Sequence, residues 1–340
     1  MNFFNSQLST LNPQLPKWLP LGLLLAVLLI FPIIIEGTSY AYLSRMAGLV
    51  GLYALLALGL NFTLGYVGLF DLGYIAFYAI GAYTAAILSI NGYSFLASTF
   101  AAIVVSVFVR LLVGVTILRL RGDYLAIVTM GFGEITRIVF NNWDSLTNGP
   151  KGLPSVGESI RPVKILGMTL VTNTHYYYLI AASVILTILV SQRLENSRLG
   201  RAWVAIREDE VAAELTGLAV ARLKLGAFVI SAVFAGLAGS IFAHWERFVT
   251  PESFVFWESI LLISMIVTGG MGSIRGVILG AVLLGGVPQL LQAALVGSRF
   301  IDYRYFFFGL VLVLAVLFRP QGLWPSKRRQ VEILETEYVN

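Results

Sequence analysis

Two ionisable residues stand three positions apart inside an apolar stretch of the sequence, where an unpaired charge is costly. Glu134 and Arg137 share one face of a predicted helix, so each can neutralise the other. Such a pair either lies beside a path for a polar solute or fixes the packing of neighbouring helices. The other candidates for lining a path lie in or just before an earlier apolar run: Asp71, Tyr74 and Tyr78.

The glycine-containing segment that ends at Asp71 is open to two interpretations. Residues 65–71 are either a broken or re-entrant segment that lines a cavity or a short turn between two helices, with Asp71 as the N-cap of the second. A similar cluster at 269–272 suggests a faint inverted repeat, although a chain with 33 glycines also produces such clusters by chance. Arg110, in a later run, either extends towards the membrane surface or joins the Glu–Arg pair.

The motifs of common enzyme and nucleotide-binding classes are missing from the sequence. It has no Gly-x-x-x-x-Gly-Lys-Ser/Thr loop, so any ATP would be hydrolysed by a different chain. It has no Cys, and its two His, His175 and His244, are too few for a His-rich metal site. The His-Glu-x-x-His and Gly-x-Ser-x-Gly motifs are also absent. We therefore predict that this chain is not an enzyme and carries no cofactor of its own.

The elements that position these residues are predicted to be membrane-spanning helices. Of the 340 residues, 58% are hydrophobic and 12% are charged, and the mean hydropathy is +0.84, which is too apolar for an ordinary soluble domain. The apolar runs are too long for the strands of a membrane barrel. We predict an all-α, polytopic integral membrane helix bundle with about eight to ten transmembrane helices. The runs lie at about 19–35, 42–64, 69–90, 95–118, 124–141, 176–192, 224–245, 254–271, 277–297 and 304–318.

The positions of Lys and Arg predict which segments face the cytoplasm. With a cytoplasmic N-terminus and every run crossing, the inside segments carry about twice as many Lys and Arg as the outside ones. Residues 1–18 and 320–340 are then cytoplasmic segments that flank a membrane domain at 19–319. The turn-rich segment 141–174 is a periplasmic loop, and 193–222 is cytoplasmic. We assign the net charge of +5 to this topology and predict no nucleic-acid partner, because the cations do not cluster with stacking aromatics.

The first apolar run needs a separate decision, because a cleaved signal segment also begins near the N-terminus. The run at 19–35 is longer than the apolar core of a signal peptide, and no small-residue cleavage pattern closes it convincingly. We interpret it as a retained membrane helix, with a cleaved signal as the alternative.

Segment 193–222 differs from the other connections because it mixes charged residues with apolar ones spaced three to seven apart. This pattern is typical of short amphipathic helices that lie across a membrane surface. Within it, the small residues Ala212 and Ala213 precede a break at Gly217. The residues alone favour a solvated loop, and the alternative is an element that transmits a partner's motion to the membrane helices.

Ordered motifs across most of the chain resemble the LivM-type permease subunits of branched-chain and neutral amino acid ABC importers. They are Gly65-Tyr66-Val67-Gly68-Leu69, the segments 72–83 and 118–129, Gly131-Phe132-Gly133-Glu134, Gly200-Arg201-Ala202-Trp203, the segment 205–210, Thr250-Pro251-Glu252-Ser253-Phe254, Gly269-Gly270-Met271-Gly272 and Arg319-Pro320-Gln321-Gly322-Leu323. The resemblance implies one permease chain of an inner-membrane importer that works by alternating access. Its partners would be a second permease, two ABC ATPase subunits, a periplasmic solute-binding protein, the amino acid substrate and membrane lipid.

The resemblance also implies where the ATPase subunits bind. The coupling helix of related permeases carries Glu-Ala-Ala, three further residues and Gly. Here Val211-Ala212-Ala213 followed by Gly217 matches all but the Glu, and Glu210 is displaced by one position. The candidates for coupling to the ATPase are Arg207, Glu208, Asp209, Glu210, Ala212, Ala213 and Gly217.

Three alternatives to an amino acid importer remain. Urea and short-chain amide importers use related permeases, although residues 73–83 look more like the amino acid branch. A secondary transporter driven by protons or Na⁺ would use Glu134 or Asp71 as its coupling acid, but it leaves segment 193–222 without a task. A membrane-embedded enzyme is disfavoured by the missing catalytic motifs.

Overall fold

The computed structural model describes residues 32, 42–118, 120, 122–165, 168–294, 309, 310, 313, 317 and 322–325. The predicted first helix at 19–35, the last run at 304–318 and the terminal segments 1–18 and 320–340 lie wholly or largely outside the described residues. These four assignments therefore stay predictions.

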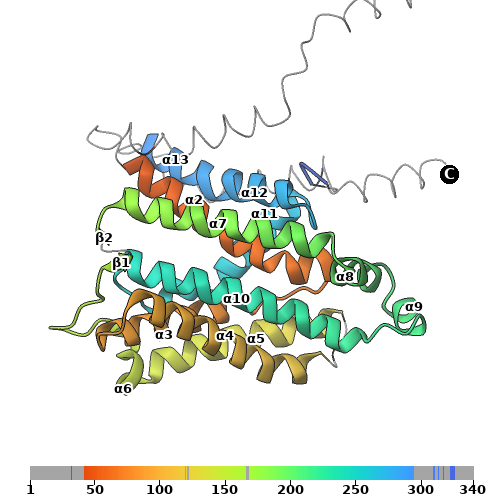
Figure 1. Cartoon of the computed structure of the whole chain (residues 1–340), viewed down its shortest axis with the longest axis horizontal. Coiled ribbons are helices and arrows are strands. Elements are labelled where there is room, and N and C mark those ends of the chain that lie inside the picture. The colour runs from red at the N-terminus through yellow and green to blue at the C-terminus, as the bar shows by residue number, and fades with distance from the viewer. Residues whose placement is uncertain are drawn as a thin grey trace, which may run out of the picture.

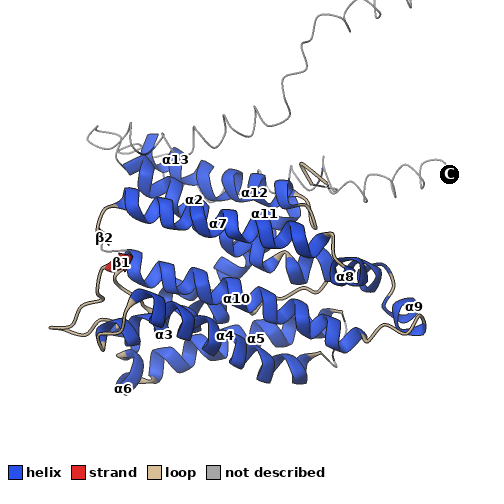
Figure 2. Cartoon of the chain, viewed as in Figure 1, coloured by secondary structure: helices blue, strands red, loops and turns tan. Residues whose placement is uncertain are grey.

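The protein is a polytopic helical membrane protein, as predicted, and every described part of the predicted runs from residue 42 to residue 294 contains helix (Figure 2). Among the described residues, five helical segments are long and apolar enough to cross a membrane: Tyr42–Val67, Phe95–Ile117, Asn173–Glu195, Val220–Glu246 and Pro251–Gly269. Two further apolar helical segments are shorter: Tyr74–Ile90 and Ile274–Leu290.

The elements follow one another with short connections. The longer helices are α2 (Tyr42–Leu60), α3 (Tyr74–Ile90), α4 (Phe95–Ile117), α5 (Asp123–Asn142), α7 (Asn173–Glu195), α10 (Val220–Glu246) and α11 (Phe256–Gly269). The shorter helices are α6 (Asp144–Thr147), α8 (Arg198–Glu208), α9 (Glu210–Leu215), α12 (Ile274–Ala281) and α13 (Val287–Ala294). The π-helical turns are η1 (Phe62–Val67) and η4 (Val282–Gly286), and the 3₁₀ turns are η2 (Gly149–Lys151) and η3 (Pro251–Phe254).

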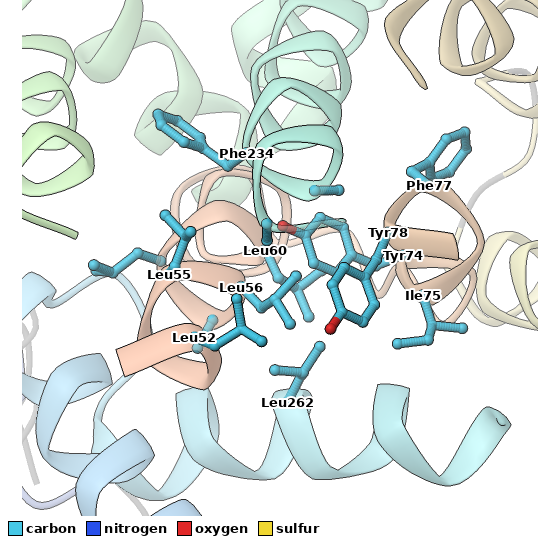
Figure 3. Close-up of a cluster of buried hydrophobic side chains, with 14 of the residues drawn as sticks. Leu52, Leu55, Leu56, Leu60, Tyr74, Ile75, Phe77, Tyr78, Phe234 and Leu262 are labelled. Atoms are coloured by element: carbon cyan, nitrogen blue, oxygen red, sulfur yellow. The ribbon is translucent and has the colours of Figure 1, made fainter. Parts of the chain in front are cut away.

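Helix α10 lies at the centre of the bundle, where it packs most extensively against α3 and α4 (Figure 1). Helix α2 packs against α7, α10, α11 and α12 and so joins the two sides of the bundle. Their shared core contains fully buried side chains such as Leu55, Phe77 and Leu262 (Figure 3). Small residues at the helix contacts let the backbones approach closely. This matters because the hydrophobic effect does not drive helices together in lipid, so their association depends on tight packing.

Gly239 in α10 marks one of these close approaches and gives a testable prediction. A β-carbon there would lie 2.6 Å from the backbone nitrogen of Ala82 and would also meet the backbone carbonyl of Tyr78, both in α3. Gly239→Ala is expected to destabilise the bundle by about 1–3 kcal/mol, because backbone rather than a flexible side chain must move. Gly226→Ala, in the same helix with nothing within 4 Å, is the control and should be neutral or slightly stabilising. Unfolding midpoints in detergent measure both, and equal midpoints would exclude this tight contact.

The segments outside the bundle lie at its two ends. The strands β1 (Val163–Ile165) and β2 (Met168–Leu170) form an antiparallel hairpin at one end, and α8 and α9 lie at the other (Figure 1). A backbone bridge between Leu153 and Val249 joins the loop before β1 to the segment that follows α10. The sequence predicts a loop here but no strands, because three-residue strands leave no clear alternation of apolar and polar residues.

Candidate coupling element and solute path

Helix α8 is held against the ends of the membrane helices by a buried tryptophan. The indole nitrogen of Trp203 donates to the backbone carbonyl of Leu223 in α10 at 2.8 Å. Its ring meets the ring of Phe62 in η1 edge-on, with centroids 6.2 Å apart. Phe62 in turn stacks on Phe234 of α10 at 5.7 Å. A displacement of α8 would therefore move Trp203 against η1, which follows α2, and against α10.

Helix α9 is oriented by two of the acidic residues predicted to contact an ATPase. Asp209 is its N-cap, and one carboxylate oxygen accepts from the backbone nitrogens of Val211 at 2.8 Å and Ala212 at 3.0 Å. Glu210 forms a 2.7 Å ion pair with Lys224, whose side chain is buried. Both side chains thus contribute to the geometry of the element itself. Whether they also contact a partner stays a prediction.

Helix α9 ends at Gly217, which has a left-handed backbone with φ of +87°. In this conformation the Leu218 nitrogen donates to the carbonyl of Ala213 at 3.2 Å, and the Gly217 nitrogen donates to the carbonyl of Glu214 at 2.9 Å. The break predicted at Gly217 is therefore a helix C-terminus. Segment 193–222 contains two short helices, α8 and α9, as its amphipathic spacing predicted. Residues 212–215 are helical and not the solvated loop that the residues alone favoured there.

The outer surface of α9 carries apolar side chains that were not among the residues predicted to couple to the ATPase. Leu215 is 84% exposed and Val211 is 54% exposed, whereas Ala213 is buried against the bundle. Ala212, Glu208 and Gly217 are also exposed. An exposed apolar pair on a short, well-held helix is a typical feature of a surface that another protein covers.

Unlike the exposed side chains of Val211 and Leu215, the Arg207 side chain extends into the protein. Its Nη1 atom donates to the carbonyl of Gly65 in η1 at 2.5 Å. Beside this contact, the backbone nitrogen of Gly272 donates to the side-chain oxygen of Asn61 at 3.0 Å. The two glycine clusters noted as a possible repeat therefore meet at one point, next to the arginine of α8.

Asp71 and Arg110 form an ion pair inside the bundle, with side chains that are 0% and 3% exposed. The guanidinium carbon of Arg110 lies 4.4 Å from the ring centre of Phe77 and 3.9 Å from that of Phe228. The N-cap of α3 is Gly73, so the alternative in which Asp71 caps this helix is wrong. Both alternatives for Arg110 are wrong, because it neither joins the Glu–Arg pair nor reaches the surface.

Tyr74 and Tyr78 project from the first turns of α3 into the core (Figure 3). The Tyr74 hydroxyl lies against Gly59, where a side chain would displace it. The ring of Tyr78 lies among aromatic rings, with centroids 5.1 Å from Phe254 and 5.5 Å from Phe242. In this conformation both tyrosines take part in helix packing, so a contact of either with a solute stays a prediction.

The predicted pair of Glu134 and Arg137 is present, and a third charged residue extends it. Arg137 Nε lies 3.0 Å from a carboxylate oxygen of Glu134, and its Nη1 lies 3.2 Å from one of Glu252 in η3. The Glu134 and Arg137 side chains are about one-third exposed, and that of Glu252 is 70% exposed. Glu134 lies in the second half of α5, and Glu252 is the second residue of the candidate span Pro251–Gly269, so the three charges lie near one end of that span. We call Glu134, Arg137 and Glu252 the charged triad. Asp71 is not part of it.

In the sequence, Glu252 stands out only as part of the family-like motif at 250–254. Its pairing with Arg137 depends on a contact across 115 positions, which no local pattern predicts. Within the described part of the chain, no three His, Asp or Glu side chains are grouped so as to hold a metal ion.

Comparisons with known proteins place this geometry in context. The family described as branched-chain amino acid transport system / permease component matches residues 42–316. The chain is 42% identical over 308 residues to the high-affinity branched-chain amino acid transport system permease protein LivM of Escherichia coli, covering 85% of this chain and 71% of that protein. LivM of Salmonella typhimurium is 41% identical over the same shares. The LivH permease of Salmonella typhimurium is 28% identical over 191 residues, or 55% of this chain and 60% of LivH. No solved structure matches the chain.

Proposed function

The chain belongs to the branched-chain amino acid transport permease family, and we propose that it is a permease subunit of an ATP-binding-cassette importer that carries branched-chain or neutral amino acids across the inner membrane. The observation that carries this proposal is the identity of 41–42% to two LivM permeases over most of the chain. We propose further that it works with a second permease, two ATPase subunits and a periplasmic binding protein. ATP would then be hydrolysed by the partners, and no chemistry would occur on this chain.

Residues 207–217 are the part of this chain that we propose the ATPase contacts. Two features support this: α8 is held firmly by Trp203, and α9 exposes the apolar side chains of Val211 and Leu215. A rigid element with an apolar outer surface can transmit a push without being deformed by it. This end of the bundle would face the cytoplasm together with both termini, and the β1–β2 end would face the periplasm.

The charged triad is the part of the surface that we propose for the solute path. Ionisable side chains at membrane depth face protein or water, because exposure to lipid is costly. Glu134, Arg137 and Glu252 are nevertheless partly exposed on this chain, so water or a second permease has to cover them. Asp71 and Tyr74 are enclosed by helix packing, and a path role for either of them, or for Tyr78, requires the helices to move apart.

Charge substitutions in the triad distinguish a path role from a packing role. Arg137→Gln is expected to lower uptake at least about tenfold, because it removes the shared partner of the Glu134 and Glu252 carboxylates beside the proposed path. If the triad only fixes packing, the neutral double variant Glu134→Gln/Arg137→Gln should regain uptake. If it lines the path, the double variant stays impaired at normal membrane levels. Uptake of labelled leucine measures both variants, and Lys164→Gln, exposed in β1, is the control.

The substrate and the energy source need a separate experiment. Uptake of labelled leucine, alanine and urea should be measured in a deletion strain that expresses the chain with its partner subunits. We expect leucine or alanine uptake, no urea uptake, and complete loss of uptake when the ATPase subunits are removed. Uptake that persists without the ATPase and disappears with the proton gradient would instead identify an ion-coupled transporter.

A further inference from the structure

The Arg207 side chain occupies a space that glycines on two other elements leave open. A β-carbon at Gly68 would lie 2.9 Å from Arg207 Cγ, and one at Gly272 would lie 3.4 Å from Arg207 Nη1 and 3.1 Å from the Gly65 carbonyl. Both glycines also have left-handed backbones, with φ of +78° and +76°. Side chains at these two positions would therefore crowd the arginine or the carbonyl that it binds.

The carbonyl that Arg207 binds belongs to the last turn of a long helical segment. Tyr42–Val67 is a continuous span, and its final carbonyls have no amide donors ahead of them in the helix. Gly65 contributes one of these carbonyls, and a guanidinium placed there both donates to it and complements the negative end of the helix dipole. Arg207 thus joins α8 to the end of α2 by an interaction that the span cannot supply itself.

The turn that receives this contact has an unusual backbone. Residues 62–67 are π-helical, a form that occurs mostly as single turns and often at functional sites. The same turn reaches the connection between α11 and α12 through Asn61, which accepts from the Gly272 nitrogen. We call the meeting point of Asn61, Gly65, Gly68 and Gly272 the glycine junction. Three separate parts of the bundle meet there: α8 through the bond of Arg207 to the Gly65 carbonyl of η1, and the α11–α12 turn through the bond of Gly272 to Asn61.

We propose that Arg207 is the positioning residue that transmits displacement of α8–α9 to the glycine junction, and so sets whether the inner ends of α2 and α11–α12 are together or apart. The proposal rests on the proposed function and refines it, because it assigns Arg207 to the interior and not to the ATPase contact. The planar guanidinium suits this role, since its several donors are fixed in one fork and can follow a moving carbonyl. A lysine at this position could supply only a point charge.

The variant Arg207→Met tests the proposal in the complete transporter. We expect normal amounts of assembled complex, with leucine uptake lowered at least tenfold and no stimulation of the ATPase by leucine-loaded binding protein. Arg207→Lys should retain part of the uptake. Arg201→Met is the matched control, because Arg201 is exposed on the same helix and donates only to the nearby Asn196 carbonyl at 3.1 Å, so wild-type uptake is expected.

A second variant separates transmission from a loss of folding. Gly272→Ala keeps the arginine but places a β-carbon against the Gly65 carbonyl and the guanidinium. If both variants break the same contact, Gly272→Ala should also uncouple ATPase activity from uptake, and the double variant should be no worse than Arg207→Met. Uptake effects that add in the double variant would overturn the proposal. So would full coupling in Arg207→Met, or loss of ATPase binding in proportion to loss of uptake. Absence of ATP-dependent leucine uptake by the wild-type complex would instead contradict the proposed function.

Discussion

Replacing Arg110 with methionine is expected to destabilise the folded chain by about 3–5 kcal/mol, one of the two largest effects that the structure predicts. The loss of stability would come from the Asp71 carboxylate, which remains after its partner is removed. Asp71 would keep a charge inside the bundle with a fully buried side chain and no cation beside it. Methionine fills much of the same space between Phe77 and Phe228, so the loss would come from the unpaired carboxylate more than from a cavity.

The double variant Asp71→Leu/Arg110→Met is the control for this effect. It removes both charges and leaves apolar side chains, and a buried ion pair replaced in this way is often neutral in stability. We therefore expect the double variant to be clearly more stable than Arg110→Met. Unfolding midpoints of the purified protein in detergent, with the yield of monodisperse protein as a second readout, measure the three chains. Equal stability of wild type and Arg110→Met would show that the pair contributes nothing.

This ion pair illustrates what the sequence predicts poorly. Both charges were recognisable in the sequence, but their pairing with each other was not predicted. Their pairing spans 39 positions and depends on which face of α4 meets the turn before α3. The small and polar residues of α4 mark its buried face, since Ser98, Ala102, Ser106, Arg110 and Gly114 recur four positions apart. They do not indicate which other element this face meets.

The helices themselves were predictable for a physical reason. A backbone in lipid has to satisfy its own hydrogen bonds, so a long apolar run permits essentially one structure. The short features have no such constraint. The π-helical turn η1 and the hairpin β1–β2 depend on local contacts with other elements, and their sequences carry no period that distinguishes them from ordinary turns.

The candidate site was predictable to an intermediate degree. Spacing alone gave the Glu134–Arg137 pair, because residues three apart on a helix always share a face. The position of residues 207–217 followed from charge and amphipathic spacing, together with the resemblance to related permeases. The direction of each side chain did not follow. Arg207 points inward and Leu215 points outward, and the difference depends on how α8 and α9 sit on the ends of the bundle.

The outward direction of Leu215 leads to the other large effect. The double variant Val211→Asp/Leu215→Asp is expected to abolish ATP-dependent uptake and to weaken binding of the ATPase subunits at least about a hundredfold. A carboxylate buried in an apolar contact without a partner costs several kcal/mol, and each 1.4 kcal/mol is a factor of ten in affinity. Co-purification of the ATPase subunits with the permease, titrated with free ATPase, measures the loss.

The exposure of both side chains makes this experiment informative about docking and not about folding. Leu215 and Val211 contribute little to the core of this chain, so membrane insertion and the unfolding midpoint should stay at wild-type values. Val156→Asp is the matched control, since Val156 is fully exposed in the loop before β1, at the end of the bundle opposite to α9. If the α9 variant binds the ATPase normally while Val156→Asp does not, the two ends of the bundle have been assigned the wrong way round. If both variants bind normally, residues 207–217 are not the contact, and the inward side chains of α8 would serve only to hold the helix in place.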